Sequence, residues 1–165
     1  MKQFVGVGIT VGVLAGIWTQ VSVQLGLITW VAFVSWACFY AVGGGREGFQ
    51  KGLASNLTGV VYGWLVSLLI THASFPGALA IGVGVVALFM CLQAGATLLS
   101  FIPGAFVGTA VFFGTAFKFW PTVLALVVGA VLGWASAVSG AWIQGRVTHG
   151  APVLAEEAGA PVQAA

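Results

Sequence analysis

The sequence predicts an all-α protein embedded in a membrane, with six transmembrane helices. Three observations lead to this fold class: 60% of the 165 residues are hydrophobic, only 5% are charged, and the mean hydropathy is +1.11. Soluble domains carry about 25% charged residues, and eight acidic and basic side chains cannot give a chain of this length a wettable surface. The composition therefore excludes a soluble enzyme, a nucleic-acid binder and a disordered protein.

Six apolar runs approach the length of about 20 residues that a membrane-crossing helix needs. They are residues 4–20, 26–42, 52–70, 77–97, 100–117 and 121–144. Turn-forming residues such as Gly43-Gly44-Gly45 and Pro76-Gly77 separate them. We expect a single transmembrane bundle over residues 1–145. Residues 146–165, rich in Ala, Gly and Pro, are expected to form a disordered cytoplasmic tail.

The placement of Lys and Arg predicts the orientation of the chain, because loops on the cytoplasmic side carry an excess of both. If the N-terminus lies inside, the inside segments hold four of the five basic residues, and the outside segments hold only Lys118. The four are Lys2, Arg46, Lys51 and Arg146. Both termini are therefore expected in the cytoplasm.

The two halves of the sequence resemble each other at an offset of 70 to 73 residues. Residues 9–15 match residues 81–87 at five of seven positions, and the Ala-Phe-Val of 32–34 recurs at 105–107. The pattern Gly-x-Val-x-Gly-Trp of residues 59–64 recurs at 129–134. We interpret residues 4–70 and 77–144 as two copies of a three-helix repeat.

Three spans per repeat require the second copy to enter the membrane from the opposite side. Inverted repeats of this kind are found in many transporters, where the solute path lies at the repeat interface near the midplane. The alternative is a gene duplication that made a stable bundle without a path. The repeat therefore favours transport and does not establish it.

No Asp, Glu, Lys or Arg lies deep in any predicted span. Charges inside a membrane are typical of proton relays and ion sites, so their absence argues against coupling to protons or sodium through carboxylates. It also argues against an enzyme, because no general base or nucleophile with a base is visible. Isolated His and Cys residues predict neither a metal centre nor another cofactor.

Neutral polar residues remain as candidates for a solute path. They are Asn56, Gln93, Thr97, Pro103, Gly104 and Thr109. Buried amides need hydrogen-bond partners, which helix–helix packing often supplies. In the functional interpretation, the same amides line a path and bind a small uncharged solute such as water, urea, a short amide or ammonia.

Pro103 has two interpretations, because proline removes a backbone donor and restricts the residue before it. It either begins the fifth span as part of a helix cap or breaks a helix at membrane depth, where a break is tolerated only in a cavity or inside protein.

Glycines spaced four residues apart predict close helix packing. They are Gly8, Gly12, Gly16, Gly59, Gly63, Gly104, Gly108, Gly129 and Gly133. The contacts lie either within the chain or between copies in a homo-oligomer.

Several short motifs resemble a family of small bacterial inner-membrane proteins known as domain of unknown function 1097. The motifs are Gly16-Ile17-Trp18, Leu25-Gly26-Leu27, Lys51-Gly52-Leu53-Ala54, Met90-Cys91-Leu92-Gln93-Ala94 and the segment from Leu99 to Gly108. The resemblance covers about residues 5 to 145. It implies a six-span protein of the bacterial inner membrane and assigns no catalytic or binding residue.

Together these observations predict an uncoupled channel or facilitator for a small uncharged polar solute. The alternative is a membrane scaffold or a partner subunit of another complex that transports nothing. The expected partners are the lipid bilayer, a small neutral solute and further copies of the chain, with no nucleic acid.

Overall fold

The computed structural model describes residues 5–73 and 75–157, with side chains up to residue 146. This part of the chain is helical and contains no strand. The long helices are α1 (Val5–Gln24), α4 (Leu53–His72), α5 (Ala78–Leu92) and α7 (Phe119–Glu157). Two helices of 13 residues lie between them, α2 (Thr29–Ala41) and α6 (Ile102–Gly114). Short turns complete the chain: α3 (Gly45–Glu47), η2 (Gly48–Gly52), η3 (Gln93–Gly95) and η4 (Thr97–Leu99).

The six predicted spans correspond to six apolar helices, but only four are long enough to cross a membrane. These four are Val5–Gln24, Gly45–His72, Ala78–Gly95 and Phe119–Arg146. A helix of 13 residues is about 20 Å long at 1.5 Å per residue, and the hydrocarbon core is about 30 Å thick. The lengths of α2 and α6 therefore do not support the prediction that residues 26–42 and 100–117 each cross the membrane.

The structure continues α7 to Glu157, so the tail predicted as disordered from residue 146 begins within a helix. Residues 158–165 of that tail lie outside the described residues. Between α2 and α4, α3 and η2 lead the chain into α4, and Lys51 and Glu47 form an ion pair of 3.4 Å on this segment.

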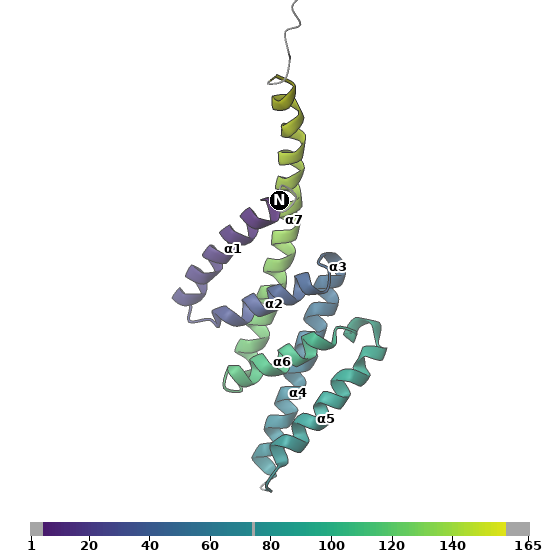
Figure 1. Ribbon diagram of the computed structural model, residues 1–165. Coiled ribbons are helices and arrows are strands. Elements are labelled where there is room, and N and C mark those ends of the chain that lie inside the picture. The colour runs from purple at the N-terminus through teal and green to yellow at the C-terminus, as the bar shows by residue number, and fades with distance from the viewer. Residues whose placement is uncertain (1–4, 74, 158–165) are drawn as a thin grey trace, which may run out of the picture.

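The helices of the two halves exchange partners (Figure 1). The long helices α4 and α7 run in opposite directions and touch each other. α1 and α2, from the first half of the chain, pack mainly on α7, whereas α5 and α6 pack mainly on α4. Each half therefore supplies a long helix that the other half covers.

Close contacts between α4 and α6 recur between α7 and α2. Gly59 packs against the carbonyl of Ala105, and Gly129 packs in the same way against the carbonyl of Ala32. Neither glycine has room for a Cβ atom. One turn further on, a Cβ at Gly63 would lie 2.8 Å from the Phe112 ring, and one at Gly133 would lie 2.7 Å from the ring of Phe39.

The turns that follow α2 and α6 have the same hydrogen bonds. The amides of Gly43 and Gly44 donate to the carbonyls of Tyr40 and Phe39 at 2.9 and 3.0 Å. At the same offset, the amides of residues 116 and 117 donate to the carbonyls of residues 113 and 112 at 3.0 and 3.1 Å. Both turns have positive φ angles. They are 111° at Gly43 and 70° at Gly44 in the first turn, and 53° at residue 116 and 64° at residue 117 in the second.

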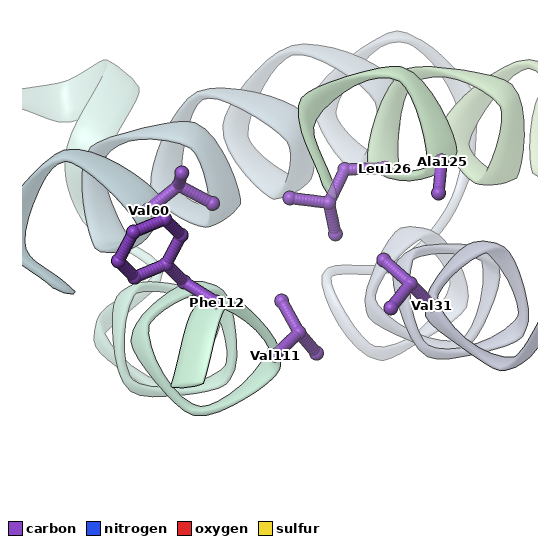
Figure 2. Packing of buried hydrophobic residues seen from close by; sticks show 6 residues of the cluster. All are labelled: Val31, Val60, Val111, Phe112, Ala125 and Leu126. Carbon is purple, nitrogen blue, oxygen red and sulfur yellow. The ribbon is translucent and has the colours of Figure 1, made fainter. Parts of the chain in front are cut away.

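The hydrophobic core lies where α2, α4, α6 and α7 meet (Figure 2). It consists of Val31, Val60, Val111, Phe112, Ala125 and Leu126. Burial of apolar side chains inside a membrane protein gains packing rather than relief from water, because lipid is as apolar as leucine. The close glycine contacts therefore matter more to this fold than the apolar core does.

Candidate functional site

Asn56 is a residue of α4 whose side chain faces α2. Its side chain is fully buried, with an exposed fraction of 0%. The amide nitrogen donates to Ser35 Oγ at 3.4 Å, and Ser35 Oγ donates to the carbonyl of Leu126 on α7 at 2.6 Å. The amide oxygen Oδ1 has no hydrogen-bond partner among the described residues. Three helices therefore meet at a polar group that is incompletely satisfied.

One further polar side chain contacts this amide, and another buried polar residue precedes Asn56 in the sequence. Cys38, buried on α2, interacts with the Asn56 side chain. Ser55 precedes it on α4, is fully buried, and has a hydroxyl without a hydrogen-bond partner in the described part of the chain. An unpaired buried polar group costs about 1–3 kcal/mol. Such a group is therefore uncommon at a position that serves helix packing alone. We call Ser35, Cys38, Ser55 and Asn56 the central polar cluster.

Gln93 and Thr97 lie in the short turns that follow α5, and these turns pack near η2 and the N-terminal part of α4. The hydroxyl of Tyr62 donates to Gln93 Oε1 at 3.1 Å, while Gln93 Nε2 is buried without a partner in the described residues. Thr97 is exposed, and its carbonyl accepts a bond of 2.9 Å from the hydroxyl of Ser100. The structure does not bring these two residues to the central polar cluster.

Pro103 is the second residue of α6, so it belongs to the first turn of a helix and not to a break within one. Pro103 is exposed, whereas Gly104 is buried against Phe101 and Ser55. Thr109 donates to the carbonyl of Gly59 at 2.7 Å, which ties α6 to α4. Of the six predicted path residues, four lie in contacts of α4 with its neighbours: Asn56, Gln93, Gly104 and Thr109.

Five cavities of about 240 to 480 Å³ open on the described part of the molecule. None of the five is lined by any of the six predicted path residues. The cavity of about 480 Å³ is a groove between α1 and α2, with Gly8, Phe33 and Tyr40 in its lining.

A second polar cluster, which the sequence did not indicate, lies between α1, α2 and α7. Ser136 Oγ donates to the carbonyl of Gly133 at 2.8 Å and accepts from Trp36 Nε1 at 3.0 Å. Because the only proton of this hydroxyl is engaged, the Tyr40 hydroxyl donates to Ser136 Oγ, at 2.7 Å. Thr10 donates to the carbonyl of Ser136 at 3.0 Å. The polar groups named here all have hydrogen-bond partners. This cluster therefore joins the three helices and leaves none of these groups free for a ligand.

The glycines divide into two groups. Gly59, Gly63, Gly104, Gly108, Gly129 and Gly133 all lie in close contacts between helices. Gly8, Gly12 and Gly16 on α1 have no atom within 4 Å of the position that a Cβ would take. In the part of the chain that the structure describes, their face of α1 therefore has no close partner.

The apolar helices, four of them long enough to cross a bilayer, and the uncharged polar interior define an integral membrane protein of the α-helical class. Residues 8–141 match the family described as "Protein of unknown function (DUF1097)", and the chain belongs to this family. This confirms the resemblance that the sequence motifs indicated.

Curated relatives are similar over most of their length. The inner membrane protein YcdZ of Escherichia coli K12 is 36% identical over 151 residues, which cover 88% of this chain and 91% of YcdZ. YcdZ of Salmonella typhimurium LT2 is 35% identical, with 88% and 92% covered. The uncharacterized protein YahC of E. coli K12 is 34% identical, with 85% and 92% covered. No solved structure matches the chain significantly.

Proposed function

We propose that the two halves form an inverted three-helix repeat, with both termini in the cytoplasm. The recurring glycine contacts and the recurring turns after α2 and α6 support this arrangement. The antiparallel course of α4 and α7 also supports it, because each is the third helix of its half. The orientation rests on the excess of Lys and Arg in the segments assigned to the cytoplasm.

The protein acts, in this proposal, as an uncoupled channel or facilitator for a small uncharged polar solute. The observation that carries it is the fully buried Asn56 amide at the junction of the two halves, whose oxygen has no partner among the described residues. Solute sites of inverted-repeat transporters lie at this place in the fold.

Reconstituted protein tests the proposal. Stopped-flow light scattering follows the entry of urea, short amides, glycerol and ammonia into liposomes, against empty liposomes. We expect one class of solute to enter faster with the wild-type protein. This acceleration is lost in Asn56→Leu, which keeps four side-chain heavy atoms branched at Cγ but has no hydrogen-bonding group. Thr10→Val is the matched control, because it removes a buried bond between helices at a distance from Asn56. Equal rates for Asn56→Leu and wild type contradict the proposed path.

The exposed glycine face of α1 favours a second function, that of a scaffold or partner subunit. Glycines four residues apart allow helices from two chains to approach closely, and Gly8, Gly12 and Gly16 contact nothing within the described chain. If this function is correct, Gly12→Leu lowers the oligomeric state measured in detergent while solute entry never exceeds that of empty liposomes. A wild-type monomer would contradict assembly of copies through this face.

A further inference from the structure

The amide oxygen of Asn56 is one of the fully buried polar groups that lack a partner among the described residues. Three side-chain atoms in the described part of the chain are buried without one: Ser55 Oγ, Asn56 Oδ1 and Gln93 Nε2. Gln93 is partly exposed, and a serine hydroxyl can rotate toward any neighbour. Asn56 is fully buried, and its amide has two fixed ends with opposite hydrogen-bonding character.

Ser35 determines which end of the Asn56 amide is left free. Its hydroxyl proton is engaged by the carbonyl of Leu126 at 2.6 Å, so its oxygen offers only lone pairs to α4. The Asn56 end that faces Ser35 must therefore be the donor Nδ2, which lies 3.4 Å away. The acceptor Oδ1 is consequently the end that remains for a bound molecule.

A free carbonyl oxygen in an uncharged setting selects a neutral molecule that donates a hydrogen bond. Residues 29–41 of α2 and 53–72 of α4 contain no Asp, Glu, Lys or Arg, and neither do residues 119–145 of α7. A site that bonds a donor rejects an analogue that lacks it, because the buried acceptor is then left unpaired. Molecules with N–H or O–H groups fit, whereas a molecule with acceptors alone does not.

The other half of the chain offers no equivalent acceptor. At the offset of Gly59 and Gly129, the position that corresponds to Asn56 is Leu126, which is also fully buried. At the offset of Phe39 and Phe112, the position that corresponds to Ser35 is Gly108. In the described helices the backbone contacts therefore recur, whereas the free amide acceptor does not.

We propose that Asn56 Oδ1 is the binding site for one small neutral hydrogen-bond donor, with an N–H or O–H group, and that Ser35 is its positioning residue. The proposal deepens the function proposed above and rests on it, since it names the chemical class of the solute. Acetamide and acetone form the decisive pair of probes, because they have nearly the same size and differ by an amino group in place of a methyl group.

A single NMR signal reports on this site. Asn56 is the only asparagine in the sequence, so labelling asparagine with ¹⁵N makes one side-chain amide visible in the full chain in lipid nanodiscs. We expect acetamide to shift this resonance saturably and acetone to leave it unmoved at the same concentrations. Equal shifts from both probes, or no shift from acetamide, overturn the proposal.

Ser35→Ala tests the positioning role without removing the amide. Without the Ser35 oxygen, Nδ2 loses its acceptor and the amide can turn, so the preference for acetamide over acetone should fall by about tenfold, the value of one neutral hydrogen bond. Thr10→Val is the control that should retain the preference, since its bond to Ser136 does not touch Asn56. An unchanged preference in Ser35→Ala overturns the role of Ser35. The single resonance reports whether each labelled variant has folded.

The NMR experiment tests the binding site and the liposome experiment tests transport, so either proposal can be contradicted without the other. A resonance that responds to acetamide, without faster entry into liposomes, supports the site and contradicts transport. Faster entry with an unresponsive resonance supports transport and overturns the site. Asn56→Leu gives a further test by dialysis, because it should fold, as Leu126 does at the equivalent position, and lose acetamide binding while remaining helical by circular dichroism.

Discussion

The surroundings of α2 and of α6 differ in polarity although their backbone contacts are alike. α2 packs on α7 as α6 packs on α4, with glycines against carbonyls in both places. Around α2 the side chains are polar, and around α6 the corresponding side chains are small or apolar. The pairs are Ser35 and Gly108, Cys38 and Val111, Tyr40 and Phe113, Asn56 and Leu126, Thr10 and Gly82, and Ser136 and Val66.

This difference distinguishes the close helix contacts, which both halves share, from the polar side chains, which only one half has. Helices in the α6 half pack closely with few side-chain hydrogen bonds between them, so glycine and apolar contacts suffice to build the arrangement. The polar groups around α2 are therefore additions to a fold that can form without them. Those that are satisfied, such as Ser136, join helices, whereas Asn56 has a free acceptor that packing does not explain.

The largest effect is expected at the glycines that both halves share. Gly59→Ala and Gly129→Ala each place a Cβ against a carbonyl of the facing helix, which must then move away. We expect each variant to lose about 3 kcal/mol of stability, measured by unfolding in detergent. Gly12→Ala is the matched control, because nothing lies within 4 Å of its Cβ position. Similar losses at all three positions would contradict the described contacts.

Ser136→Val should be the next most harmful change, since it gives α7 the residue found at position 66 of α4. The variant leaves Trp36 Nε1 and the Tyr40 hydroxyl without their acceptor, which costs about 2 kcal/mol. Adding Tyr40→Phe, the residue at position 113, removes one of these unpaired groups and should restore part of the loss. Additive losses in the double variant would exclude this coupling.

Asn56→Leu should make the protein more stable by about 1 kcal/mol, because it removes a buried acceptor that has no partner. The same variant should abolish acetamide binding. Unfolding in detergent and the binding measurement on one preparation check both effects. A loss of stability comparable to that of Ser136→Val would instead identify Asn56 as a residue that mainly holds the helices together.

The smallest effect concerns the two equivalent turns. Ala116 has a φ of 53°, a left-handed conformation that glycine adopts without strain, and Gly43 takes the corresponding place with a φ of 111°. Ala116→Gly should therefore stabilise the protein by at most about 1 kcal/mol. Gly43→Ala should destabilise it by a similar amount. A loss of stability in Ala116→Gly would indicate that the Ala116 methyl group makes a contact worth more than the strain.

Most of the helices could be predicted from the sequence, and their ends and partners could not. Hydropathy locates an apolar segment but not its last helical residue. The predicted spans 26–42 and 100–117 therefore include apolar residues, such as Leu27 and Phe101, that lie outside α2 and α6. The exchange of helices between halves is a tertiary property, and a repeat in the sequence does not reveal which copy a helix packs against.

The candidate site was predicted in part for the same reason. A lone asparagine in an apolar span is conspicuous, so Asn56 could be found from the sequence. Ser35 lies in an apolar run where serine is common in membrane helices, and only the structure places it beside the amide. Thr97 and Pro103 attracted attention as polar or turn-forming residues, but both are exposed.

The exchange of partners between the halves also determines the order in which the molecule can be completed during synthesis. α1 and α2 leave the ribosome first, yet the helix that covers them, α7, is made last. α4 likewise waits for α5 and α6. α1 and α2 must therefore remain in the bilayer without their main partner until α7 arrives, whereas α4, α5 and α6 can pack together before α7 is made.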